Sequence, residues 1–281
     1  MSVKVEVSHD GVPHNTVMMK NGILALFFLY IAIAAASVAG DGSWSYPAIA
    51  CVSGGIAAVF TLRWGNSTIK KLCSYGIGTG VPSAGMLAFG SGVIAMLFAT
   101  KVNPFLVPIA GLLVALIVGL ILGWISNSVL NMKIPVMTRS IAELAAVGCL
   151  TLMGLTAVAT GDIGYDQITT GLTDPYASYI SAGIIAVAFI LGAIALQHPF
   201  NACLGPGEKQ DRTDLLAIEC GFLSMIVMAV ISFAFVSQIA AWISFVIALI
   251  GWFVTYRQFF ALSKRDAAAW LDAKPFSDAE E

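Results

Sequence analysis

Long apolar runs constrain the fold of this 281-residue chain more than any other feature. A helix needs about 20 apolar residues, at about 1.5 Å per residue, to cross roughly 30 Å of hydrocarbon. By that criterion we predict eight membrane spans, at residues 21–39, 46–63, 84–100, 105–130, 140–159, 177–196, 214–235 and 238–258. The division between the last two spans is the weakest of these predictions, followed by the short, Gly- and Ser-rich second span, so six or seven spans stay open. The predicted fold class is all-α, a polytopic bundle of membrane helices.

Composition points to the same class. Hydrophobic residues make up 58% of the chain and charged residues only 11%, whereas a soluble domain carries about 25% charged residues. With a net charge of −2, the chain has no basic patch available to bind phosphates, so we expect no nucleic-acid partner. The five cysteines are dispersed without a CxxC pair, which predicts reduced, structural thiols.

Lys and Arg are distributed unevenly between the two sides of the predicted bundle. With the N-terminus in the cytoplasm, the inner loops and tails receive all of the 14 Lys and Arg residues except Lys101. The positive-inside rule therefore predicts a multi-pass protein of the cell membrane with both termini in the cytoplasm. We predict a cytoplasmic tail at 1–20, a transmembrane domain at 21–260 and a second cytoplasmic tail at 261–281.

Three predicted inner loops concentrate Gly, Pro and polar residues: WGNSTIKKLCSYGIGTGVPSAG (64–85), NMKIPVMTRSIAE (131–143) and QHPFNACLGPGEKQDRTD (197–214). Such segments are typical of broken or re-entrant backbone on the cytoplasmic side, which is tolerated where it lines a wet cavity. In the third loop we expect Pro199 and the pair Gly205–Pro206 to break the helix. His198 and Asn201 would then bind the freed backbone groups or a ligand.

The glycine-rich segment GIGTGVPSAG (76–85) argues against regular helix. It is not a dinucleotide fingerprint, because Val81 stands where G-x-G-x-x-G requires Gly, and it lacks the Lys of a P-loop. Its backbone N–H groups, the helix start that follows and the nearby Lys70 and Lys71 favour an anion site. A flexible inner loop is the other interpretation, and the residues leave both open.

Three carboxylates near the predicted inner ends of spans are candidates for an ion path, because a charge inside a membrane helix is costly and faces protein or water. They are Glu219, Asp214 and Glu143. Glu143 also completes an S-x-x-E pattern with Ser140, so a capping box is its alternative role.

Other patterns carry less chemistry. His198 and Cys203 have too few neighbouring ligands for a transition-metal site, and nothing completes a Cys–His nucleophile pair, so we expect no catalytic residue here. Asn66 begins an N-S-T sequon, but it falls on the predicted inner side, where glycosylation is not expected. Gly119 and Gly123 form a GxxxG pattern that favours close helix packing.

The inner-loop motifs resemble those of the C subunit of tetrahydromethanopterin S-methyltransferase, the sodium-pumping methyltransferase complex of methanogenic archaea. The matches are A-x-QHPFNACLGP (Ala195–Pro206, followed by Arg212–Thr213), S-Y-G-x-GTGVPS (Ser74–Ser83) and MKIP (Met132–Pro135). They keep their order and spacing over a chain of the family's length.

The resemblance implies an enzyme complex that moves a methyl group from methyl-tetrahydromethanopterin, or tetrahydrosarcinapterin, through a corrinoid to coenzyme M, coupled to sodium export. It implies that the A subunit carries the corrinoid, and that this chain packs with the D and E subunits and lipid in the membrane. The chain alone is then expected to be inactive and to bind no cofactor of its own.

The resemblance assigns no residue roles, so the sites are hypotheses from physical chemistry. Glu219, Asp214 and Glu143 are the candidates for the sodium path. The candidates for a cavity that receives the sulfonate of coenzyme M are Lys70, Lys71, Gly78, Thr79, Gly80, Ser83, His198 and Asn201. A stand-alone secondary transporter and a purely structural anchor protein are the alternative functions.

Overall fold

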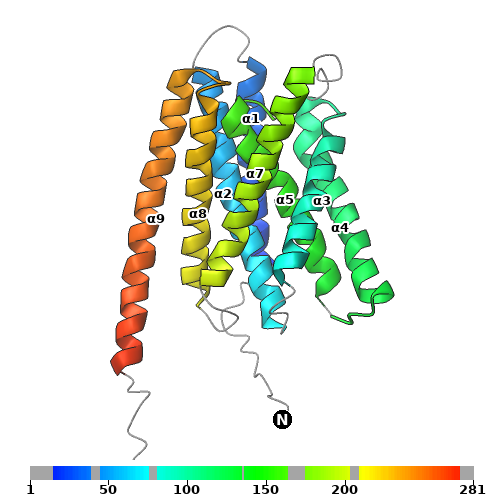
Figure 1. Ribbon diagram of the computed structural model, residues 1–281, viewed down its shortest axis with the longest axis vertical. Coiled ribbons are helices and arrows are strands. Elements are labelled where there is room, and N and C mark those ends of the chain that lie inside the picture. Colours follow the sequence, from blue (N-terminus) through cyan, green and yellow to red (C-terminus); the bar gives the residue numbers. More distant parts are fainter. Residues whose placement is uncertain are drawn as a thin grey trace, which may run out of the picture.

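The computed structural model describes residues 15–38, 45–75, 81–134, 136–163, 175–202 and 209–272. Within these ranges the chain is helical, without strands, and the long helices run up and down in a bundle (Figure 1). The helices are α1 (Asn15–Val38), α2 (Ser45–Ser74), α3 (Val81–Ala99), α4 (Val107–Trp124), α5 (Met137–Thr160), α7 (Pro175–Ala202), α8 (Gln210–Ser232) and α9 (Gln238–Asp272). Short helical turns at Pro104–Leu106 and Ile125–Val129 flank α4.

The predicted all-α membrane bundle is confirmed. Seven of the described helices are long and apolar enough to cross a membrane, and Ser83–Ala99 in α3 is a shorter apolar helix. The weakest predicted division is also correct, because α8 ends at Ser232 and α9 begins at Gln238. Helix α9 continues to Asp272, past the predicted end of the transmembrane domain at residue 260. The exact limits of the two tails stay predictions.

Helix α5 is the centre of the bundle. Every residue from Ser140 to Ala159 is buried, and α5 contacts α1, α2, α3, α4, α7 and α8. Small residues make this packing possible: a Cβ on Gly119 of α4 would lie 2.5 Å from the Cα of Ala142, and one on Gly123 would lie 2.5 Å from the Cα of Thr138. The close approach predicted from the GxxxG pattern is therefore present between α4 and α5.

One end of the bundle gathers the positive charge. It is the end at which α1, α3, α5 and α8 begin and α2, α4, α7 and α9 end, at the bottom of Figure 1. We call it the basic end, because every described Lys and Arg except Lys101 lies in that half of the molecule. The long α9, about 52 Å at 1.5 Å per residue, extends beyond the other helices there (Figure 1).

Two predicted loops are partly helical. Helix α2 runs through the first predicted loop as far as Ser74, because hydroxyls in that stretch bond back to their own helix. Ser67 Oγ donates to the carbonyl of Arg63 at 3.1 Å, and Ser74 Oγ donates to that of Lys71 at 2.7 Å. These bonds use polar groups that would otherwise compete with helix formation.

The prediction that Pro199 breaks its helix is wrong, because α7 continues through Pro199 to Ala202. A proline only three residues before a helix end removes one backbone hydrogen bond and has little helix left to disrupt. The other predicted breaker, Gly205–Pro206, lies outside the described residues, as do Gly78, Thr79 and Gly80 of the glycine-rich segment.

The turn between α4 and α5, which carries the MKIP motif, is closed by an asparagine. Asn127 Oδ1 accepts from the N–H of Ile134, and its Nδ2 donates to the carbonyl of Ile134, both at 2.9 Å. Asn131 and Lys133 adopt left-handed backbone conformations, with φ of 55° and 54°. The amide of Asn127 thus fixes a tight turn in which two non-glycine residues take an unfavourable conformation.

Candidate functional site at the basic end

An ion pair joins α2 to α8. Arg63 Nε lies 3.4 Å from Asp214 Oδ2, and Gln210 Nε2 donates to Asp214 Oδ1 at 2.6 Å. The Asp214 side chain is 11% exposed and that of Arg63 is 36% exposed. Because burial of an unpaired carboxylate is costly, the two partners explain how Asp214 is tolerated inside the bundle.

A second charged pair lies within α5, and its carboxylate also binds α2. Glu143 accepts from Arg139 Nε at 2.7 Å through Oε1 and from Thr68 Oγ1 at 3.0 Å through Oε2. The capping-box interpretation is wrong, because α5 is capped by Val136 without a side-chain bond and Ser140 lies a full turn inside the helix. Both oxygens of Glu143 are therefore occupied in a structural network between α2 and α5.

Glu219 differs from the other two carboxylates. It is 9% exposed, and its Oε2 makes no hydrogen bond with any described residue. Its carboxylate interacts with His198 of α7 and with Trp252 of α9. Five residues separate Glu219 from Asp214, which places them about 140° apart around α8. The structure therefore does not bring the two into one site.

A cavity of about 380 Å³ lies along α7 near the basic end. One side of it is polar, with His198 and Asn201, both exposed, and Gln197. The apolar lining comes from Met86 of α3 and from Phe189, Ile190, Ala193 and Ile194 of α7. His198 Nδ1 lies 3.8 Å from Cys220 Sγ of α8. The cavity therefore presents a polar patch beside an apolar wall, a combination typical of small-ligand sites.

The described parts of the segments 64–85 and 197–214 meet at this cavity. A Cβ on Gly85, in the first turns of α3, would lie 3.7 Å from Gln197 Nε2 and 3.9 Å from Ile69 of α2. Ser83 is exposed close to the start of α3, while Lys70 is fully buried and Lys71 half-buried near the end of α2. The ends of α2 and α7 and the start of α3 thus converge. Lys70 is too deeply buried to line the mouth of the cavity.

Sequence reasoning missed the partners of the carboxylates. Gln210 could have been indicated by its i, i+4 spacing from Asp214. Arg63 and Thr68 lie on another helix than the acids they bind, so they had no local signal. Among the described residues, no three His, Cys, Asp or Glu side chains gather in a way that could hold a metal ion.

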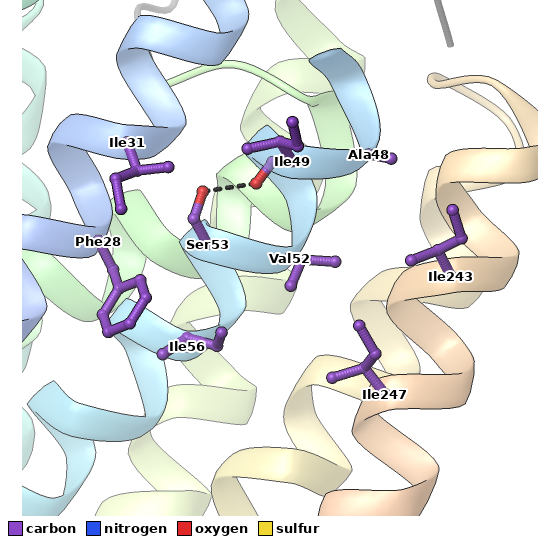
Figure 2. Close-up of a pocket in the computed structure, with 9 residues that line it drawn as sticks. All are labelled: Phe28, Ile31, Ala48, Ile49, Val52, Ser53, Ile56, Ile243 and Ile247. Carbon is purple, nitrogen blue, oxygen red and sulfur yellow. Dashed lines mark hydrogen bonds between the residues drawn. The ribbon is translucent and has the colours of Figure 1, made fainter. Parts of the chain in front are cut away.

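A larger cavity, of about 470 Å³, opens between α1, α2 and α9 far from the basic end. Figure 2 shows apolar side chains around it, including Phe28, Ile49 and Ile247. Its one polar side chain, Ser53, donates its hydroxyl to the carbonyl of Ile49 at 2.6 Å. No polar group is therefore available there for chemistry, and the candidate site remains at the basic end.

A bundle of long apolar helices with its ion pairs and polar cavity at one basic end defines a multi-pass membrane protein. The chain belongs to the family of the C subunit of tetrahydromethanopterin S-methyltransferase, whose family model matches residues 1–275.

Relatives from several methanogens support this assignment. The chain is 35% identical over 272 residues to the C subunit of tetrahydromethanopterin S-methyltransferase from Methanosarcina barkeri, an alignment that covers 96% of this chain and 95% of the relative. It is 38% identical over 228 residues to that of Methanosarcina mazei, covering 81% and 83% of the two chains. It is 34% identical over 227 residues to that of Methanothermobacter thermautotrophicus, covering 79% and 82%.

Proposed function

We propose that this chain is an integral membrane component of a methyltransferase complex that moves a methyl group from methyl-tetrahydromethanopterin, or its sarcinapterin variant, to coenzyme M and exports sodium. The observation that carries the proposal is the family match, which spans nearly the whole chain. The proposed partners are the D and E membrane subunits and the A subunit, which would carry the corrinoid. No observation favours the transporter or anchor alternatives over this function.

Purification of the tagged chain from its native membrane in mild detergent tests the assignment. We expect other membrane subunits and a corrinoid absorption band to be retained, and methyl transfer to coenzyme M to depend on sodium. Chemical cross-linking before solubilisation guards against dissociation in detergent. A colourless single polypeptide after cross-linking would contradict the proposal.

The proposed orientation puts the basic end in the cytoplasm. Lys and Arg are retained on the cytoplasmic side of membrane proteins, and Lys101 is the one described basic residue at the opposite end. The first described helix begins at Asn15 and the last ends at Asp272, and both of these residues lie at the basic end. Proteolysis of the C-terminal tail in right-side-out and inverted vesicles tests this orientation, with cleavage expected only in the inverted ones.

The cavity formed by α3 and α7 is our candidate for the coenzyme M site of this chain. The sulfonate is an anion that accepts hydrogen bonds, and His198 and Asn201 supply donors at the basic end, where positive charge gathers. We expect His198→Leu and Asn201→Leu to raise the KM for coenzyme M more than they lower kcat. Ile180→Ala, an exposed position at the far end of α7, is the control. An unchanged KM in both leucine variants would refute the site.

Glu219 is our candidate for the sodium path among the three predicted carboxylates. Sodium is a hard cation that takes oxygen ligands, and Glu219 Oε2 is buried without a partner among the described residues, whereas Glu143 has both oxygens bonded. We expect Glu219→Gln to raise the sodium concentration needed for half-maximal methyl transfer in the assembled complex. Val227→Ala, at an exposed position on the same helix, should leave it unchanged. Equal sodium dependence of the two variants would reject the assignment.

A further inference from the structure

Asn66 is the most unusual buried side chain of the bundle. It is 0% exposed, and neither its Nδ2 nor its Oδ1 makes a hydrogen bond with a described residue. Buried amides are almost always hydrogen-bonded, because a lost bond leaves the full cost of desolvation. An amide with no partner at either atom among the described residues therefore indicates a ligand.

The position of Asn66 on α2 places it toward α8. Residues 55, 59, 62 and 66 follow one another at helical spacing and share one face of α2. On that face, a Cβ on Gly55 would touch Met225 of α8, and one on Gly221 of α8 would touch Val59 and Leu62. Asn66 lies eight residues before the end of α2, so it is about 12 Å inside the basic end.

A second amide without a full set of partners lies on α8, the helix that packs against this face of α2. Gln210 of α8 donates to Asp214, but its Oε1 is buried without a partner among the described residues. Asp214 is paired with Arg63, which precedes Asn66 by three residues on α2. The two amides therefore flank one ion pair, whose guanidinium side chain is 36% exposed.

The chemistry of the amide selects the ligand. A cation could bind Oδ1 of Asn66 but would leave Nδ2 without an acceptor, and an anion would do the reverse. Water donates and accepts, and buried waters typically serve two to four such protein groups.

We propose that Asn66 lines an aqueous crevice between α2 and α8, which reaches about 12 Å into the bundle from the basic end and holds water as its ligand. The pair formed by Arg63 and Asp214 lies beside it, between α2 and α8. The crevice lies on the face of α8 opposite the one that carries Glu219. The inference rests on hydrogen bonding within this chain and is independent of the proposed methyl transfer.

Cysteine labelling tests the crevice. Asn66→Cys is made in a background whose native cysteines are replaced, and the purified complex is treated with a small, charged, membrane-impermeant thiosulfonate. Modification of the peptide that contains residue 66 is followed by mass spectrometry. The matched control is Ala58→Cys, two turns away on α2, where the native side chain is 0% exposed and packs against Gly154 of α5.

We expect the cysteine at position 66 to react about tenfold or more faster than the one at position 58, which would react only when the helix opens locally. Equal rates would overturn the proposal. The rate should be the same in sodium, potassium and choline chloride, because water is the ligand. Slowing by sodium alone would mean that a cation occupies the site, and would also overturn it.

The near-isosteric Asn66→Leu variant gives a test that does not depend on labelling. In a dry site this change would remove two unsatisfied polar atoms and raise the melting temperature. In a hydrated crevice it exchanges water-bonded groups for apolar surface, so we expect a melting temperature equal to or below that of the native chain. A higher one would reject the crevice, whereas failure of sodium-dependent methyl transfer in the native complex would reject the proposed function alone.

Discussion

Gly154 of α5 lies where α5 crosses α2, and its replacement by Ala tests the packing that positions the site. A Cβ there would lie 2.5 Å from the carbonyl oxygen of Gly54 and 2.9 Å from the backbone nitrogen of Ala58. These are backbone atoms that no rotamer change can move, so the two helices must separate by about 0.5 Å or more to reach an ordinary contact. Overpacking of this kind costs about 1–3 kcal/mol.

A matched glycine isolates this effect from helix propensity. Gly183 of α7 has nothing within 4 Å of the position that a Cβ would take, so Gly183→Ala should stabilise its helix by up to about 1 kcal/mol. Both variants gain the same helix propensity, so they should differ by the overpacking cost alone, about 1–3 kcal/mol, with Gly154→Ala melting at the lower temperature. Melting of the purified protein in mild detergent, at one heating rate, measures the difference. Equal melting temperatures would refute the argument that backbone contact sets the distance between α2 and α5.

Three further substitutions probe the polar network by the same melting assay. Arg139→Ala should destabilise the protein by about 1 kcal/mol rather than more, because the Arg139 side chain that pairs with Glu143 is 56% exposed and screened by solvent; a loss above about 3 kcal/mol would contradict this. Asn127→Ala removes two hydrogen bonds from the α4–α5 turn, so it should cost about 1–3 kcal/mol and speed tryptic cleavage at the exposed Lys133. Thr151→Val removes the buried 2.8 Å hydrogen bond that the Thr151 hydroxyl donates to Thr61 of α2. We expect a cost of only about 1 kcal/mol, since the Thr61 hydroxyl still donates within its own helix.

Hydrophobic length predicted the fold well, because crossing a bilayer imposes one criterion on every span. The predictions were least accurate at helix ends. The stretch from Trp64 to Ser74 looks like a loop because it contains Asn, Ser, Thr and two Lys. It is nevertheless a buried part of α2, since polar side chains can lie inside a bundle where neighbouring helices supply hydrogen-bond partners or enclose water. A single sequence does not show where those partners lie.

The candidate site shows the same limit. The acids and the polar motifs were identified from the sequence, but the roles of Glu143 and Pro199 depend on where the helices start and end. Helix α5 begins three residues before Ser140, so the S-x-x-E pattern falls inside the helix and cannot cap it. Pairing of Asp214 with Arg63, 151 residues earlier, follows from tertiary packing and has no local signal.

Asp214 and Glu219 are both sequence candidates for the sodium path, but they lie on different faces of α8. Asp214 faces α2, where Arg63 balances its charge, while Glu219 faces α7 and α9 with one oxygen unbonded to any described residue. If sodium passes Glu219, Glu219→Gln should change the sodium dependence of methyl transfer but leave the labelling of a cysteine at position 66 unaltered. If Asp214 carries the sodium path instead, Asp214→Asn should be the variant that shifts sodium dependence, and the assignment of Glu219 would fail. Because the two carboxylates lie on different faces of one helix, these substitutions can be read independently.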